Sequence, residues 1–339
     1  DFGHNRILRE PYQGVFHLFI FYGFIALTIT TAIVFLQADV IYPIWHVWFM
    51  KGSFYLGLKL FANTFGALAI IGITMALIRR YVMKPNWLDE KPEDRIILWF
   101  ILVILITGFM VEGLRMQAVE IRSGSVMYPY IWYSWGGRLT AYLFSWMDEI
   151  SLRGIHAIMW WTHTFLALTF FVYLGYSKLL HIFVTPVNIF LRNTADNRAP
   201  IRVMPPEMFE ETETFGIHTP EEFSWKDLFD VEACVRCGRC VQVCPAFNTD
   251  KPLAPRDVIQ DIRTYMETKA KFAIQADGSY KILTDEEYPG PALIGDTIDK
   301  HAIWACTTCM ACVEACPSHI QQFPKLYDLR PYLVMKESD

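Results

Sequence analysis

The chain has 339 residues, which is enough for two domains. It is 53% hydrophobic and 15% aromatic, with a positive mean hydropathy, and these values are high for a soluble enzyme. A formal net charge of −5 without a basic tract argues against binding to nucleic acid. The long apolar runs lie before residue 190 and all eight cysteines after residue 230, so the sequence predicts a membrane half followed by a cysteine-rich half.

Four segments are apolar and long enough to cross a bilayer, which requires about 20 apolar residues per helix. They are Val15–Leu36, Phe54–Ile78, Ile96–Val111 with an extension to Met116, and Ile155–Phe183. A fifth stretch, Val126–Met147, mixes Trp, Tyr, Pro and Gly with Arg138, and we interpret it as an interfacial element, with a fifth span as the alternative. The prediction is a transmembrane bundle of four helices, or alternatively five.

Basic residues in the short loops predict the orientation. The loop after the first span holds only Lys51, whereas the loop after the second is rich in Lys and Arg. These basic residues are Arg79, Arg80, Lys84, Lys91 and Arg95. The rule places this loop, the amino terminus and everything after Phe183 on the cytoplasmic side. We therefore expect a multi-pass protein of a bacterial or archaeal cytoplasmic membrane.

Three histidines, His156, His163 and His181, are predicted to lie on the fourth span. His163 and His181 are 18 residues apart, or about five turns, so they share a face with Cα atoms roughly 27 Å apart. His17 lies on the first span at the depth expected for His181. Because two facing imidazoles can bind haem iron axially, we predict a haem b held by His17 and His181. Hydrogen bonding between helices is the alternative, but ionisable residues inside membranes usually mark function.

His163 is the predicted ligand of a second haem b. Its candidate partner is His46 in the outer loop, and a five-coordinate haem is the alternative.

Several polar residues near the outer ends of the spans need a role. We interpret Lys59 as a lysine that snorkels to the headgroups. For Glu112 and Arg115, snorkelling is one interpretation, and contact with a haem propionate or proton handling beside a quinone is an equally good one. With His156 they form the candidate quinone site.

The cysteines form two runs with the spacing C-x₂-C-x₂-C-x₃-C-P. The runs are Cys234, Cys237, Cys240 and Cys244 followed by Pro245, and Cys306, Cys309, Cys312 and Cys316 followed by Pro317. In such a run three thiolates hold one [4Fe–4S] cluster and the fourth ligates the other cluster. The predicted first cluster is held by Cys234, Cys237, Cys240 and Cys316, and the second by Cys306, Cys309, Cys312 and Cys244. Zinc sites use paired C-x₂-C motifs, and disulfides are disfavoured on the reducing side of the membrane, so both alternatives are weaker.

The expected fold class is mainly α: a transmembrane haem-binding bundle, followed by a helical ferredoxin-type domain with two [4Fe–4S] clusters. The expected domains are 1–189, a linker at 190–224 and 225–339. In the last domain we predict helices over Pro255–Lys271 and Asp296–Ala305, with a short strand at Tyr280–Leu283.

Both halves resemble a family of membrane-bound iron–sulfur oxidoreductases. Its members include the electron-transferring-flavoprotein:menaquinone oxidoreductases and, as relatives, the membrane-bound heterodisulfide reductases. The resemblance covers nearly the whole chain and is carried by both cysteine runs and by several membrane motifs. These are LREPYQGVFHLFIFYGF, RRYVMKP, TGFMVEGLR, WWTHTFLAL and YSKLLHIF. The histidine-bearing spans are also similar to the haem subunit of respiratory nitrate reductase.

The resemblance implies a route from reduced electron-transferring flavoprotein, itself reduced by acyl-CoA dehydrogenases, through the clusters and haem b to menaquinone. It also implies ligand roles for the eight cysteines, His17, His163 and His181. Family members usually carry one more transmembrane helix before residue 1 and CCG domains after residue 339, and the sequence has no CCG.

Two alternatives use the same residues. The chain oxidises menaquinol and supplies a cytoplasmic reductase of disulfides or sulfur compounds, or it is a non-catalytic anchor and electron wire in a larger respiratory complex. The expected partners are a cytoplasmic redox protein, menaquinone and membrane lipid.

Overall fold

A computed structural model describes residues 5–121, 125–192, 216–268, 272–274, 280–282 and 291–338. Its contacts divide the chain into two units, which we describe separately. The membrane unit contains residues 5–85 and 90–177. The cluster unit contains the short segment Asn86–Asp89 and the described residues from Lys178 onward. By contacts, the cluster unit thus begins earlier than the expected boundary near residue 190, and most of the expected linker lies outside the described residues.

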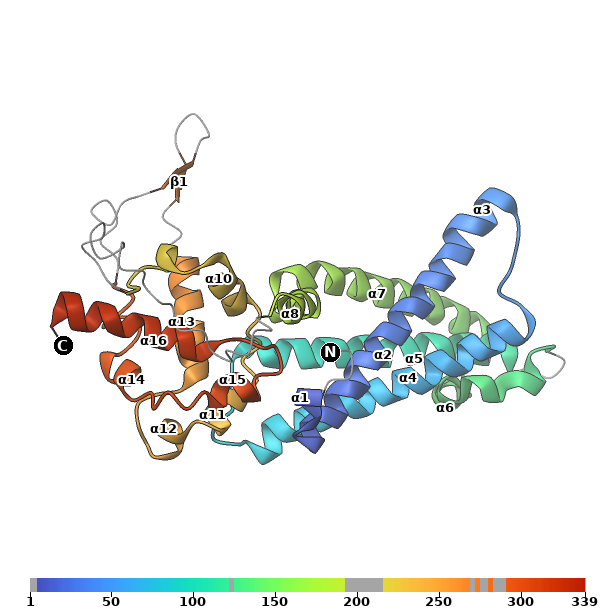
Figure 1. The fold of residues 1–339 in the computed structure, drawn as a ribbon. Coiled ribbons are helices and arrows are strands. Elements are labelled where there is room, and N and C mark those ends of the chain that lie inside the picture. Colours follow the sequence, from blue (N-terminus) through green and yellow to red (C-terminus); the bar gives the residue numbers. More distant parts are fainter. Residues whose placement is uncertain are drawn as a thin grey trace. The chain divides into compact units, whose positions relative to one another are not determined.

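The described elements of the membrane unit are helices, long ones joined by short ones (Figure 1). They are α1 (Asn5–Leu8), α2 (Pro11–Phe35) with η1 (Leu36–Ile41) and α3 (Tyr42–Trp45), α4 (Gly52–Ile78) with η2 (Arg79–Met83), α5 (Pro92–Arg115) with η3 (Met116–Glu120), η4 (Tyr128–Ser134), α6 (Trp135–Tyr142) and α7 (Glu149–Tyr176). Among the described residues, four helices are long and apolar enough to cross a membrane.

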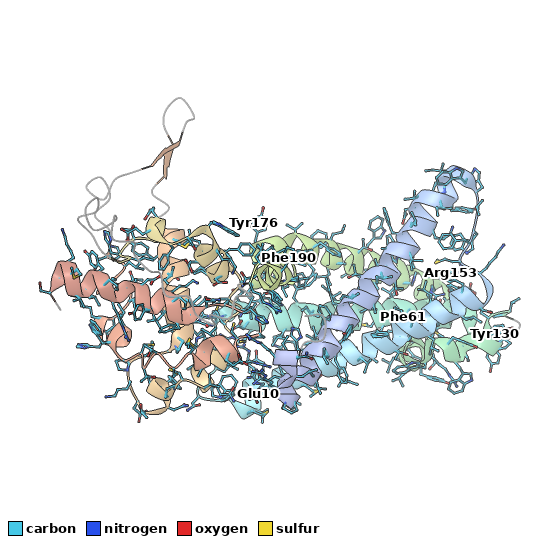
Figure 2. The ribbon with its side chains drawn as sticks, in the orientation of Figure 1. Glu10, Phe61, Tyr130, Arg153, Tyr176 and Phe190 are labelled. Carbon is cyan, nitrogen blue, oxygen red and sulfur yellow. The ribbon has the colours of Figure 1, made fainter. Side chains whose placement is uncertain are left out.

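Large apolar side chains such as Phe61 and Tyr176 are exposed on these helices, as expected for a surface that faces lipid (Figure 2). Both η4 and α6 are too short to span a bilayer, so the stretch Val126–Met147 is not a fifth span within its described residues.

Small residues let the spans pack closely. A Cβ on Gly23 of α2 would lie 2.7 Å from the Cβ of Ala69 on α4, so only glycine permits this approach. On the same pair of helices, a Cβ on Gly72 would lie 2.9 Å from the carbonyl oxygen of Phe16. Close backbone approach through small residues is how membrane helices associate when lipid is as apolar as the helix surface.

The predicted single helix carrying His156, His163 and His181 is wrong for His181. Helix α7 ends at Tyr176, and Ser177 is extended with φ −121° and ψ 171°. A 3₁₀ turn η5 (Lys178–Leu180) follows, and His181 is the first residue of α8 (His181–Phe190). Glycine is a poor helix former, and Gly175 lies two residues before the break at Ser177. Hydropathy alone did not reveal it because the segments before Gly175 and after Lys178 are apolar.

The cluster unit is also mainly helical. Its remaining elements are η6 (Pro220–Glu222), α10 (Trp225–Glu232), α11 (Arg239–Gln242), α12 (Pro245–Asn248), α13 (Pro255–Thr268), β1 (Phe272–Ile274), β2 (Tyr280–Ile282), α14 (Lys300–Trp304), α15 (Ala311–Ala315), α16 (Gln322–Tyr332) and η7 (Leu333–Glu337). The antiparallel pair β1–β2 aligns Phe272 with Ile282, and α14 begins after Asp299, whose side chain accepts from the N–H of His301. The predicted mainly α class is confirmed.

A buried polar network holds the cluster unit together beside its apolar core. Lys325 of α16 donates to Asp227 and Asp230 of α10. Asn188 of α8 donates to Asp230 and to the carbonyl of Ser318. Because the side chain of Asn188 is fully buried, these bonds tie α8 to the cysteine-bearing part of the chain.

Candidate functional site

The two cysteine runs adopt the same backbone course. In the first run, Arg236 and Gly238 flank Cys237 and have φ of 59° and 77°. In the second run, Thr308 and Met310 flank Cys309 with φ of 58° and 59°. Left-handed residues on both sides of the middle cysteine turn the chain sharply, so that successive thiols can point toward one centre.

After the third cysteine position the two runs also end alike. Cys244 and Cys316 are extended, with φ/ψ of −75°/119° and −72°/118°, and each precedes a proline. An extended residue carries the fourth thiol away from its own run. The repeated geometry therefore fits cross-ligation, as the spacing predicts.

Thiols from both runs line one hollow in the cluster unit. Cys244 lies there with the three cysteines that begin the second run, Cys306, Cys309 and Cys312. Cys316, in turn, is within electrostatic range of Cys234, Cys237 and Cys240. Cys240 is also within electrostatic range of Cys312, so the runs lie close together. The two predicted ligand sets stay predictions.

The electrostatics of these groups fit a bound metal cluster. Burial, followed by the neighbouring thiol of Cys237, raises the pKa of Cys316 to about 12. Burial and Cys306 likewise raise the pKa of Cys312 to about 12. Such groups are stable as thiolates only when a cation compensates their charge, as coordinated iron does.

The two thiol sites are adjacent but differ in exposure. Cys240 of the first site and Cys312 of the second belong to one buried apolar cluster with Val241 and Phe323. Cys316 is buried, whereas Cys309 is exposed to solvent. The second site therefore reaches the protein surface.

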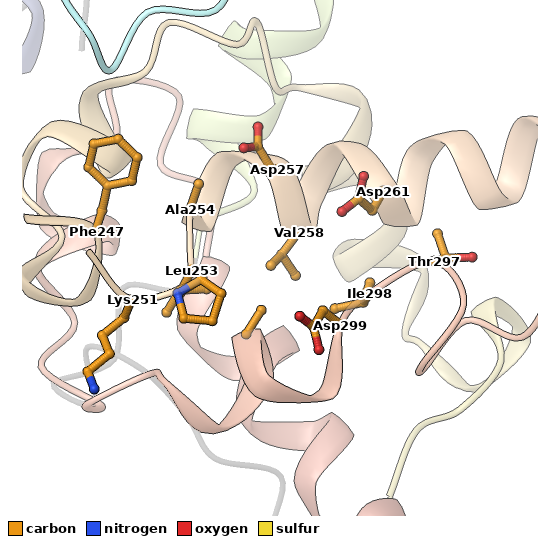
Figure 3. A pocket seen from close by; sticks show the side chains of 12 residues that line it. Phe247, Lys251, Leu253, Ala254, Asp257, Val258, Asp261, Thr297, Ile298 and Asp299 are labelled. Carbon is orange, nitrogen blue, oxygen red and sulfur yellow. The ribbon is translucent and has the colours of Figure 1, made fainter. Parts of the chain in front are cut away.

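A larger hollow of about 340 Å³ borders the second site (Figure 3). Leu253 lines both hollows, so they share a wall. The larger one carries three carboxylates, Asp257, Asp261 and Asp299, and one ammonium group, that of Lys251, around apolar side chains. Asp257 is also paired with Arg256. Its rim is therefore negatively charged.

In two of the predicted haem ligands, His163 and His181, Nδ1 forms a hydrogen bond and Nε2 is left for a metal. The ring Nδ1 of His163 lies 2.9 Å from Thr107 Oγ1, and this hydroxyl also lies 2.8 Å from the carbonyl of Val103. Because the carbonyl can only accept, the hydroxyl donates to it and Nδ1–H of His163 donates to the hydroxyl. The Nδ1 of His181 lies 2.7 Å from the carbonyl of Lys178 and must donate as well. Both rings are left with an Nε2 lone pair, as in metal-binding histidines whose other ring nitrogen donates a hydrogen bond.

Gly108 of α5 lies next to His163 and lets the two helices come close. A Cβ on Gly108 of α5 would lie 3.3 Å from Cε1 of His163, so α5 and α7 meet closely at this level. His17 lies on α2, with its ring stacked on Phe21. His46 is exposed with φ of 56° and contacts Tyr42. The pairings of His17 with His181 and of His46 with His163 stay predictions.

The structure brings the three candidate quinone residues into one polar group. Asn63 donates to Glu112 across 3.1 Å, and Arg115 is within electrostatic range of Glu112. His156 is within range of Arg115, and its buried Nε2 has no hydrogen-bond partner among the described residues.

The snorkelling interpretation of Lys59 is wrong. Its side chain is buried and donates to Glu120 across 2.8 Å, and Glu120 also pairs with Arg115. Lys59 therefore pairs with a carboxylate inside the bundle and does not extend to the headgroups.

Asn63 and Glu120 are members of the group that sequence reasoning missed. Asn63 also accepts from the N–H groups of Gly136 and Gly137 at the start of α6. Two signals in the sequence could have revealed them: Asn63 is a polar residue within an apolar span, and Glu120 follows Arg115 by five residues.

Two thiolate sites and four membrane helices in one chain define a membrane-bound iron–sulfur oxidoreductase of the electron-transfer class. Residues 16–199 match the nitrate reductase gamma subunit family, and residues 230–320 match the 4Fe-4S dicluster domain. The chain belongs to the nitrate reductase gamma subunit family through its membrane domain, with a 4Fe-4S dicluster domain following it.

Among curated proteins, the whole chain is 34% identical to EtfAB:quinone oxidoreductase of Syntrophomonas wolfei, of which it covers 48%. Over 99% of its length it is 29% identical to the probable iron-sulfur-binding oxidoreductase FadF of Bacillus subtilis, covering 49% of that protein. The chain thus spans about half the length of these relatives. Over 32% of the chain it is 36% identical to a dihydromethanophenazine:CoB--CoM heterodisulfide reductase component of Methanosarcina acetivorans, covering 25% of that protein. No solved structure matches the chain.

Proposed function

We propose that the chain passes electrons from a reduced soluble flavoprotein, an electron-transferring flavoprotein, through two [4Fe–4S] clusters and haem b to menaquinone. The observation that carries the proposal is the hollow lined by Cys244, Cys306, Cys309 and Cys312 in a chain with four membrane helices. When bound, the clusters and haem supply one-electron steps between a two-electron donor and an acceptor of two electrons and two protons. Similarity to EtfAB:quinone oxidoreductase along the whole chain supports the choice of donor and acceptor.

The soluble partner meets the chain at the second thiolate site. Exposed Cys309 supports this, because a cluster at the surface exchanges electrons with a partner that does not enter the protein. The acidic rim formed by Asp257, Asp261 and Asp299 beside that site suits a partner with basic side chains. The basic loop between the second and third spans supports a cytoplasmic position for this face.

His163 and His181 bind haem b iron through Nε2. Their Nδ1–H bonds to Thr107 and to the carbonyl of Lys178 fix the rings and raise the basicity of the ligating nitrogens. His17 is the proposed partner of His181. For His163, a pairing with His46 and a five-coordinate haem remain the two alternatives.

Glu112, Arg115 and His156 hold the quinone head and supply its protons. The buried pairing of Lys59 with Glu120 and the bonds of Asn63 fix the surrounding side chains before quinone arrives. His156 is suited to donate to a quinone oxygen because its Nε2 is not used within the described residues.

The test uses purified protein in lipid vesicles that contain menaquinone, with chemically reduced electron-transferring flavoprotein added outside. We expect b-type absorption, iron–sulfur signals, and reoxidation of the flavoprotein that depends on menaquinone. A preparation without b-type absorption contradicts the haem assignment, and reoxidation that ignores menaquinone contradicts the acceptor.

Local similarity to the heterodisulfide reductase component favours one alternative, in which the chain oxidises menaquinol and supplies a disulfide reductase. Both directions use the same residues. Midpoint potentials separate them, because electrons flow toward the higher potential: clusters above menaquinone support this second direction, and clusters below it support the first.

A further inference from the structure

The four-residue connector Asn86–Asp89 joins the second and third spans in sequence, but its contacts group it with the cluster unit. Nothing in its composition marks it as part of a metal site. Its contacts with the loop of the first cysteine run indicate that it is.

Trp87 packs against the loop of the first cysteine run. It contacts the buried cluster that contains Cys240 and Cys312, one cysteine from each site. A Cβ on Gly238, between Cys237 and Cys240, would lie 2.8 Å from both Cε3 and the carbonyl oxygen of Trp87. Gly238 also has φ of 77°, so both its conformation and its lack of a side chain are needed for the indole to lie there.

Asp89 adds a charge beside the same loop. It forms ion pairs with Arg236, which lies between the first two cysteines, and with Arg256 of α13, the latter at 3.4 Å. Arg256 also donates to the carbonyl of Trp87 across 3.0 Å. Two guanidinium groups and one connector carboxylate therefore stand beside the first thiolate site, with side-chain exposures of 20%, 9% and 19%. Arg256 also pairs with Asp257 of its own helix across 2.6 Å.

We propose that the connector is part of the first cluster site: Trp87 restricts the access of water to it, and Asp89 balances Arg236 and Arg256 beside it. Trp87 and Asp89 are positioning residues that tune the reduction potential of the cluster held by Cys234, Cys237, Cys240 and Cys316. This inference rests on the proposed function only in assuming that these thiolates hold a [4Fe–4S] cluster.

The direction of each effect follows from charge. Reduction adds a negative charge to a site already held by four thiolates, and cluster potentials respond to nearby charge and solvent exposure. Loss of the Asp89 charge favours the reduced state and raises the potential, and so does greater access of water after loss of the indole. Loss of the Arg256 charge lowers the potential.

The experiment is a potentiometric titration of the full chain, purified with its iron, followed by electron paramagnetic resonance. Cys237→Ser and Cys309→Ser assign the signals, because each changes one site. We expect Asp89→Asn and Trp87→Ala to raise the midpoint potential of the first cluster, Arg256→Gln to lower it, and Trp87→Phe to restore it close to that of the unchanged protein. The second cluster keeps its potential in Asp89→Asn and Arg256→Gln, because these charges pair beside the first run.

Two matched controls in the same unit are exposed residues of the same types, Asp250→Asn and Trp225→Ala, and both leave the two potentials unchanged. The proposal is overturned when Asp89→Asn and Arg256→Gln leave the first potential in place, or when both clusters move together. If the Trp87→Ala protein loses its iron, the opposite shifts expected for Asp89→Asn and Arg256→Gln test the proposal without it. A wild-type protein without [4Fe–4S] signals contradicts the proposed function instead, so the two failures are distinct.

Discussion

The ammonium group of Lys325 lies 2.9 Å from the carboxylate of Asp230, and neither side chain is more than 2% exposed. Lys325 also lies 3.0 Å from Asp227, so one buried cation joins α16 to α10. Gln321, in the segment after Cys316, donates its N–H to Asp230. The ion pair therefore lies directly behind the loop that carries the fourth cysteine of the second run.

Replacing Lys325 by Met removes the buried cation that bridges the two aspartates, and only Asp230 keeps a second lysine, Lys226. Removing one partner of a buried ion pair typically costs about 3–5 kcal/mol, and we expect a loss of this size in the free energy of unfolding. The measurement is the temperature at which cluster absorbance disappears on heating. As a control, Lys300→Met breaks the exposed pair with Glu337, which is worth roughly 0–1 kcal/mol. Equal losses in the two variants contradict the prediction.

The same network makes stability depend on pH. Burial alone raises the pKa of Asp230, but Lys325 and Lys226 together hold that pKa below its usual value. Lys325 and Ser224 similarly lower the pKa of Asp227 against the effect of burial. A carboxylate with a lowered pKa stabilises the fold above its unfolded pKa of about 3.9, and this contribution is lost as pH falls through the lower folded pKa.

We therefore expect the stability difference between the unchanged protein and Lys325→Met to be full near neutral pH and to shrink below about pH 4. Unfolding followed by helical circular dichroism measures it at each pH. A difference that grows toward acid pH has the wrong sign for this network.

Thr107→Val removes the acceptor for Nδ1–H of His163 while keeping the shape of the side chain. Loss of such a partner typically lowers metal affinity about 10–100-fold, so we expect weaker haem retention or a shifted haem potential. Haem content after dilution and optical redox titration are the readouts. Thr74→Val is the matched control, because Thr74 also donates to a carbonyl of its own helix across 2.8 Å. Unchanged haem binding in Thr107→Val removes His163 from the ligands.

Cross-ligation predicts that each fourth cysteine serves the other run. We expect Cys244→Ala to perturb the cluster of Cys306, Cys309 and Cys312, with iron content falling by up to about half. Cys316→Ala acts on the first cluster instead. Paramagnetic resonance spectra tell them apart, and Thr307→Ala, which lines the same hollow as Cys244, is the control. If Cys244→Ala removes the signals of its own run, the ligand sets are wrong.

Sequence reasoning succeeded where the chemistry is local. Four cysteines at fixed spacing report their site within a dozen residues, and four apolar runs report four spans. The extended conformation of Cys244 and Cys316 follows in part from the prolines after them.

It failed where a long-range contact decides the outcome. The pairing of Lys59 with Glu120 joins residues 61 positions apart, and no pattern along the chain reports it. Left-handed Thr308 and Met310 are unusual for their residue types and are held by the surrounding fold. The break at Ser177 depends on one extended residue within an apolar run, which hydropathy averages away.

The break at Ser177 also has a consequence for biogenesis. His181 begins a helix whose buried Asn188 bonds to residues on either side of the cysteine loops, so this imidazole is built into the unit that iron–sulfur maturation completes. If His181 is a haem ligand, as proposed above, insertion of that haem should wait for this maturation. Newly made chains in cells starved of sulfur transfer would accumulate without this haem, and full haem loading under such starvation would show that the two assembly steps are independent.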